Sequence, residues 1–419
     1  MFPSLSSRAL SPARRLVSAL AMSAALVGGS MMLAAPAAAQ DYSDNFVKAY
    51  QPVQTVVSAE GGDIASVSGQ FPAILAAAET ADDKFAAGNL LLMAGNKATN
   101  AQWQRQGLEL MVASGKAPPE QLGQFQFFIG NLAYNAQDYA AARTALEAAQ
   151  TAGYSAPDAD IPGLIAESYF AEGNGQAGID YIKQASERLQ ASGGQVPERW
   201  LLKALQTAYN EQLVGPATEI STLLVSTYPT EQNWKNALQV VGALNEFEPQ
   251  QQLDFLRLMR ETKVMSDRNE YVRYIEAADP RIMSNEVQGV LADAVAAGQL
   301  SASDTYYTEV KSIADQRAAA DQSEIGNLVS EAQGSAEPER AVEAGDVAWS
   351  LSDFAQAEAM YQLALDKGIA DRDTALTRLG MSQTKQGKYA EAQATLEQVG
   401  GTRAPIAQMW ALYAQTRAG

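Results

Sequence analysis

Residues 376–399 read LTRLGMSQTKQGKYAEAQATLEQV, and this stretch holds the pattern that decides the fold. Small residues stand at Gly380 and Ala392, twelve positions apart, and Val399 follows seven positions later. A large residue, Leu396, comes four positions after Ala392. Small side chains let two helices approach closely, and large ones fill the groove beside them. The stretch therefore predicts two antiparallel helices that form a hairpin.

The same spacing occurs in three other stretches of the chain. The small residues are Gly130, Ala142 and Ala149; Ala166, Gly178 and Ala185; and Gly345, Ala357 and Ala364. The large residues at the matching place are Leu146, Ile182 and Tyr361. A hairpin pattern that recurs is typical of stacked helical repeats, which bury one continuous core. We predict an all-α solenoid, and we expect it to bind other molecules rather than to catalyse a reaction.

The first 39 residues have the pattern of an export signal. Three arginines form a basic start, a mostly apolar run extends over 16–33, and Ala37-Ala38-Ala39 is a cleavage sequence. We expect cleavage after Ala39 and a periplasmic location, with secretion as the alternative. No later apolar run approaches the ~20 residues that cross a bilayer. No transmembrane segment is therefore predicted in the mature chain.

The amino-acid composition excludes several classes of catalytic and metal site. Hydrophobic residues make up 47% of the 419, and there is no Cys and no His. A Ser-His-Asp triad, a Cys-His pair and a structural zinc site are excluded, and we predict no catalytic residue, cofactor or metal. Beyond residue 39 the chain has 27 basic and 48 acidic residues, a net charge of −21. This charge repels nucleic acid and favours solubility; a basic partner is the second interpretation.

Repeats and turn residues divide the chain. We expect a leader at 40–69 with one helix, N-terminal repeats at 70–245, a helical middle region at 246–336, and C-terminal repeats at 337–419 that end in a capping helix without a partner. The repeat spacing is absent from the middle region, which reads as degenerate repeats or as a separate insert. Its expected helices are Gln250–Thr262, Asn269–Ala277, Arg281–Ala297, Ser303–Ala319 and Glu324–Ala332.

Two motifs in the C-terminal repeats carry a family resemblance. Leu376-x-x-Leu379-Gly380, followed by Lys388-Tyr389-Ala390-Glu391-Ala392, resembles the tetratricopeptide repeat (TPR) family. The stretches 341–365 and 126–149 are similar to further copies, and 161–185 to a weaker one. Successive copies are 35 and 36 residues apart here, whereas the family has about 34. The early Trp of the family is Ala341 or Leu376 in the best copies, and the closing Pro is missing.

The resemblance implies a concave groove that holds a protein or peptide. Family positions map onto a set of candidate partner-binding residues: Phe127, Asn131, Tyr134, Asn135, Trp349, Met381 and Lys385. A carboxylate clamp of the family is broken here, because its Lys is Phe127 and its next Asn is Glu167. The other interpretation of the aromatic residues is packing between repeats.

We therefore expect a scaffold or adaptor that binds protein or peptide partners in the cell envelope. Two alternatives stay open. A glycan- or nutrient-binding helical protein would have a pocket walled by aromatic residues such as Trp200, Trp234 and Tyr306-Tyr307. A cell-wall enzyme similar to lytic transglycosylases would have a buried carboxylate in a cleft, for which Glu167-Ser168 is the only motif fragment.

Overall fold

The computed structural model describes residues 40–156 and 159–418, and every regular element in these ranges is a helix. The prediction of an all-α protein is confirmed. The predicted export signal lies outside the described residues. The chain forms two compact units, and the division falls inside one helix, between Ala185 and Ser186.

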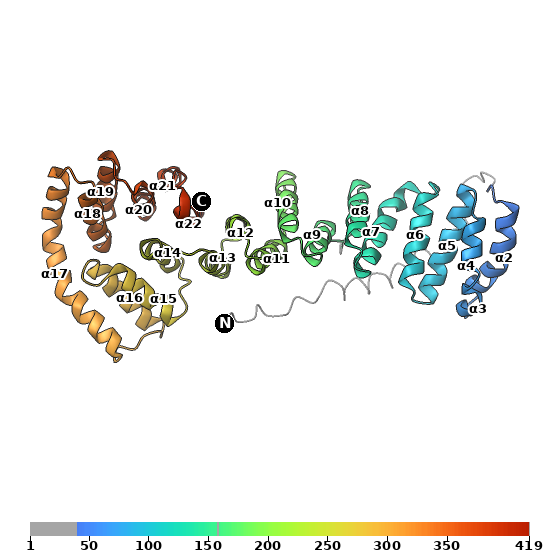
Figure 1. Ribbon diagram of the computed structural model, residues 1–419, viewed down its shortest axis with the longest axis horizontal. Coiled ribbons are helices and arrows are strands. Elements are labelled where there is room, and N and C mark those ends of the chain that lie inside the picture. Colours follow the sequence, from blue (N-terminus) through green and yellow to red (C-terminus); the bar gives the residue numbers. More distant parts are fainter. Residues whose placement is uncertain (1–39, 157–158, 419) are drawn as a thin grey trace. The chain divides into compact units, whose positions relative to one another are not determined.

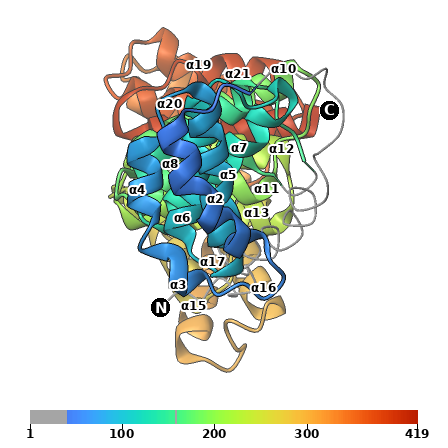
Figure 2. The same cartoon turned by 90° about the vertical axis from the view of Figure 1, so that its right-hand side faces the viewer.

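The N-terminal unit consists of short helices followed by hairpins. Figures 1 and 2 show α5 beside α6 and α7 beside α8, the two most closely packed pairs of this unit. Its helices are α2 (Asp44–Ser58), α3 (Ile64–Ser68), α4 (Phe71–Ala77), α5 (Ala81–Lys97), α6 (Ala101–Ala113), α7 (Pro119–Asn135), α8 (Tyr139–Thr151), α9 (Ile161–Ala171) and the first part of α10 (Gly175–Ala191).

The expected leader is an ordered part of this unit and contains two helices, α2 and α3, instead of one. The carboxylate of Asp83, which is fully buried, holds its beginning in place. It accepts hydrogen bonds from the backbone N–H and the hydroxyl of Ser43, at 3.1 and 2.8 Å, and from the N–H of Thr80 at 3.0 Å. These bonds attach the start of α2 to the capping box of α5.

The spacing of small and large residues acts sterically as expected. A Cβ atom added to Gly130 would lie 2.6 Å from Cγ of Leu146, and one added to Gly380 would lie 2.5 Å from Cγ of Leu396. The ring of Tyr361 fills the same place beside Gly345, at 2.7 Å. Each glycine thus gives room to the large residue sixteen positions later, which comes from the second helix of its hairpin.

The C-terminal unit contains the predicted middle region, the C-terminal repeats and also 186–245, the last part of the predicted N-terminal repeats. Its helices are α11 (Glu198–Asn210), α12 (Val214–Thr227), α13 (Glu231–Leu244), α14 (Pro249–Glu261), α15 (Arg268–Ala278), α16 (Ser284–Ala296), α17 (Thr305–Gly334), α18 (Glu339–Ser350), α19 (Phe354–Asp366), α20 (Arg372–Lys385), α21 (Tyr389–Leu396), the 3₁₀ turn η1 (Gly401–Arg403) and α22 (Ala404–Ala418). One continuous helix, α17, stands where two were expected.

This unit closes on itself. The last helix, α22, contacts α12, α14 and α20, so it has partners, unlike the capping helix that the sequence led us to expect. Trp410 of α22 is fully buried, and the ring of Tyr413 lies 5.9 Å from the ring of Trp234 in α13. Figure 1 shows the chain from α14 through α17 to α22 returning to the neighbourhood of α12.

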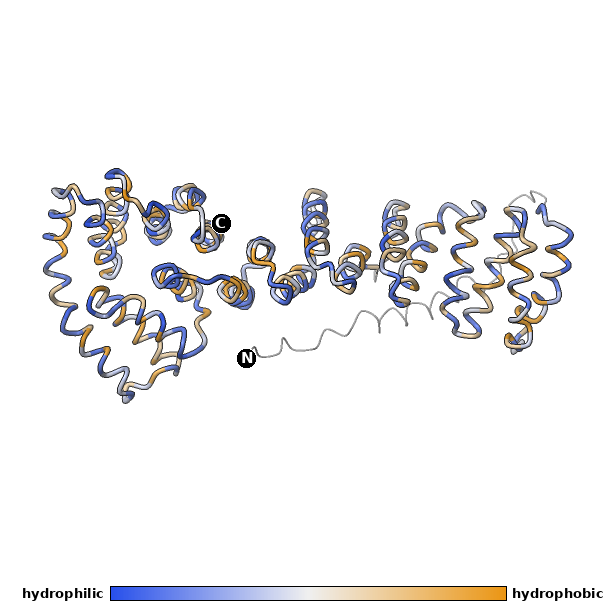
Figure 3. The backbone as a smooth tube through the Cα atoms, in the orientation of Figure 1, coloured by the Kyte–Doolittle hydropathy of each residue, from blue (hydrophilic) through white to orange (hydrophobic). Residues whose placement is uncertain are grey.

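Two helices form the centre of the closed unit. All seven residues 253–259 of α14 and all eleven residues 374–384 of α20 are buried. Both helices are nevertheless rich in polar and charged residues, and Figure 3 shows no helix that is apolar along its whole length. Within the part of the chain that the structure describes, no helix has both the length and the apolar character needed to span a membrane.

Candidate functional site

A network of buried charges lies between the two central helices. Asp254 of α14 accepts hydrogen bonds from Arg257 at 3.0 Å, from Arg378 of α20 at 3.3 Å, and from Arg403 of η1 at 2.6 Å. The indole N–H of Trp410 donates to the backbone carbonyl of the same Asp254 at 2.9 Å. Asp254 therefore joins α14, α20 and η1 through its carboxylate, and α22 through its backbone carbonyl.

The network extends to α16 and α18. Arg257 donates to both carboxylate oxygens of Glu286, at 2.8 and 2.7 Å, and Tyr274 donates to Glu286 at 2.8 Å. Nη1 of Arg378 contacts both oxygens of Asp346, at 2.8 and 2.7 Å. The three arginines face three carboxylates, so the network is neutral, as buried charges require.

These contacts keep the buried groups charged. Burial by itself raises the pKa of Asp254, but Arg378, Arg403 and Arg257 more than offset it, so the pKa of Asp254 is lowered. The pKa of Glu286 is also lowered, because Arg257 outweighs the effect of burial. Lowered pKa values favour the ionised form of both carboxylates at neutral pH. In this form they stabilise and position the helices whose side chains they contact.

The predicted groove residues of the C-terminal unit lie against other helices of that unit. These residues are Trp349, Met381 and Lys385. Trp349 is 6% exposed; its indole N–H donates to Glu286 at 3.2 Å, and the guanidinium of Arg257 lies 4.9 Å from its ring centre. Met381 is fully buried. Lys385 pairs with Glu261 of α14 at 2.5 Å. These residues lie on one face of α18 and α20, the inner face that the repeat positions assign to the groove. Helices α14 and α16 cover this inner face.

The predicted groove residues of the N-terminal unit, Phe127, Asn131, Tyr134 and Asn135, all belong to α7. Phe127 is buried against Leu146 and neighbouring apolar residues. Asn131 is 2% exposed, and its Oδ1 atom has no hydrogen-bond donor among the described residues. Tyr134 is half-buried, with its ring 5.6 Å from that of Tyr139, and Asn135 is exposed. Along α7, the polar candidates therefore range from buried Asn131 to exposed Asn135.

The aromatic residues expected to wall a nutrient pocket lie elsewhere. Trp200 and Trp234 are buried, and Tyr306 and Tyr307 pack against the core of the C-terminal unit. None of them lines the polar pocket at the start of α14 and α20. Among the residues that the structure describes, no group of three or more acidic side chains is arranged to hold a metal ion.

Sequence reasoning did not identify the central charge network. A usable signal was present, because the run LDFLRLM at 253–259 places Asp254 and Arg257 inside an apolar stretch. Charged residues in such a run are rarely fully buried unless they are paired. The partners Arg378 and Arg403 lie more than 120 residues further along, and local patterns cannot select them.

No family model matches the chain, and no curated protein matches it.

Proposed function

We propose that this chain is a protein-binding scaffold of the bacterial cell envelope, and that its N-terminal unit binds a protein or peptide partner at Tyr134 and Asn135, the accessible end of the candidate groove on α7. The observation that carries the proposal is the way the C-terminal unit uses the equivalent positions. Trp349 stands four positions after Gly345, as Tyr134 stands four positions after Gly130. Trp349 contacts α14 through its ring and α16 through its N–H.

The partner chemistry follows from the same comparison. An arginine of α14, Arg257, lies against the Trp349 ring, and aromatic faces attract cations with ~0.5–2 kcal/mol. The N-terminal unit has only 7 basic residues against 16 acidic ones over 40–185. A partner segment with basic side chains is therefore complementary in charge to this unit. The export of the scaffold rests on the sequence pattern of residues 1–39.

The test is site-specific crosslinking in cells. A photo-crosslinking amino acid replaces exposed Asn135 on α7 or, as the control, exposed Glu147 on α8. We expect a discrete crosslinked protein from position 135 that is lost when Tyr134→Ala is added, and none from position 147. Equal products from both positions, or a product from position 135 that is insensitive to Tyr134→Ala, would contradict the proposal.

A further inference from the structure

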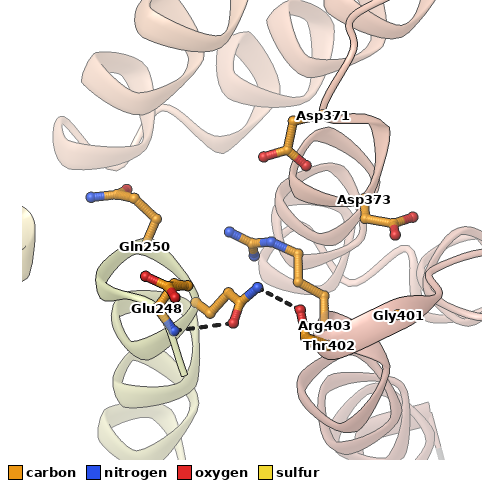
Figure 4. A pocket seen from close by; sticks show the side chains of 8 residues that line it. Glu248, Gln250, Asp371, Asp373, Gly401, Thr402 and Arg403 are labelled. Carbon is orange, nitrogen blue, oxygen red and sulfur yellow. Dashed lines mark hydrogen bonds between the residues drawn. The ribbon is translucent and has the colours of Figure 1, made fainter. Parts of the chain in front are cut away.

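A polar pocket of about 320 Å³ opens where the two central helices of the C-terminal unit begin. Its wall includes Glu248 and Gln250 at the start of α14, Asp371 and Asp373 at the start of α20, and Thr402 and Arg403 of η1. Figure 4 shows the guanidinium of Arg403 between Gln250 on one side and Asp371 on the other. The volume is within the range of small-molecule sites.

Arg403 presents unused donors to this pocket. Its side chain is only 5% exposed, and Nη1 binds Asp254 at 2.6 Å. Its Nε and Nη2 groups have no acceptor among the residues that the structure describes, and neither is a fully enclosed atom, so both donors are open to the pocket. A ligand that enters the pocket can therefore accept from them. An acceptor with its own negative charge fits this place best.

The rim of the pocket is negatively charged, opposite to Arg403. Three carboxylates, Glu248, Asp371 and Asp373, share the wall with the single guanidinium. Asp371 already accepts two bonds from Thr374, and Asp373 accepts a long one of 3.4 Å from the N–H of Gly400. Each carboxylate has about four acceptor sites, so capacity remains for further donors. A simple anion is disfavoured by this rim, and a simple cation would leave the open donors of Arg403 without an acceptor.

We propose that the pocket binds a free basic amino acid, with its carboxylate on Arg403 and its ammonium groups on the rim carboxylates. The wall carries a net charge of −2, and lysine or arginine carries a net charge of +1 with both signs present. Either ligand satisfies the donors of Arg403 and the acceptors of the rim together. The inference is independent of the scaffold proposal, because it concerns a different unit and a ligand of a different class.

Calorimetric titration of the full chain with three related compounds tests the charge pattern. L-lysine has all the groups, cadaverine lacks the carboxylate, and 6-aminohexanoate lacks the α-ammonium. We expect lysine to bind and each analogue to bind at least about tenfold more weakly, since one charged hydrogen bond contributes ~1.5–3 kcal/mol. Absence of heat with lysine, or equal binding of cadaverine, would overturn the proposal.

Charge-neutral variants locate the site. Asp371→Asn keeps a good helix N-cap while it removes the charge, and Glu248→Gln changes an exposed residue. Asp353→Asn, at the N-cap of α19 outside the pocket, is the matched control. We expect each pocket variant to weaken lysine binding about tenfold and the control to leave it unchanged. Full lysine affinity in both pocket variants, or an equal loss in the control, would refute the site; Glu248→Gln keeps the test decisive if Asp371→Asn unfolds.

Discussion

The hairpin of α7 and α8 and the hairpin of α18 and α19 are built by the same steric rule but face different surroundings. Gly130 gives room to Leu146, and Gly345 gives room to Tyr361. On the inner face, the position after each glycine is a neutral Asn131 in one and a charged Asp346 in the other. Asp346 pairs with Arg378, whereas Oδ1 of Asn131 has no donor in the described structure. The small-and-large pattern therefore specifies the hairpin, and other residues decide what it holds.

The largest loss of stability is expected from Asp254→Ala. This variant tests whether the C-terminal unit depends on buried charge while the N-terminal unit does not. Three guanidinium groups lose their shared acceptor, and breaking a buried ion pair costs about 3–5 kcal/mol. Urea unfolding of the variant should show this loss in the C-terminal unit, while amide exchange in α5 to α8 stays unchanged. The control is Asp293→Ala, whose partner Arg260 is partly exposed; it should cost under about 1 kcal/mol. Equal losses in the two variants would mean that the network contributes no special stability.

Trp349→Ala and Tyr134→Ala compare the two equivalent aromatic positions directly. Trp349 is buried against α14 and α16, so its removal should cost about 3–5 kcal/mol of unfolding free energy. Tyr134 is half-buried, and its removal should cost about 1 kcal/mol or less while partner crosslinking from position 135 is lost. Thermal unfolding followed by circular dichroism measures both. A small loss for Trp349→Ala would show that α14 and α16 do not depend on the inner face for their packing.

Gly380→Val and Gly130→Val test what the two regions share. In both, a Cβ atom would lie 2.6 Å or less from a leucine side chain, so each should cost about 1–3 kcal/mol by overpacking. Gly326→Ala in α17, where no atom lies within 4 Å of the added Cβ, is the control and should be neutral or stabilising. Unchanged melting temperatures in both valine variants would contradict the steric rule in both units.

Local sequence patterns were enough to predict most helices of this chain. The expected helix Gln250–Thr262 differs from α14 by one residue at each end, and Asn269–Ala277 differs from α15 in the same way. The expected break between residues 319 and 324 is absent, since no Gly or Pro stands there to stop a helix. Asp321 instead pairs with Arg317 one turn earlier and accepts from Ser284 of α16, which supports one continuous α17.

The surroundings of the candidate groove could not be predicted in the same way. The repeat positions placed Trp349 and Lys385 on an inner face, and both do contact helices across that face. Which helix covers the face depends on pairs such as Lys385 with Glu261, 124 residues apart. Periodicity is a property of neighbours along the chain and contains no information about such pairs. The binding role of these residues stays a prediction.

The contacts of Asp254 with residues far along the chain affect the order in which the two units fold. Asp254 needs Arg403 and Trp410, which follow 149 and 156 residues later, whereas the α5–α6 and α7–α8 hairpins are completed by neighbours in sequence. Contacts between distant residues form slowly because a long loop must close first. During synthesis the first unit is therefore ready to fold early, and the second must wait until Arg403 and Trp410 have emerged. A stop codon at or before position 403 would leave Asp254 with two of its three guanidinium partners in an incomplete core, so completion of the second unit depends on η1 and α22.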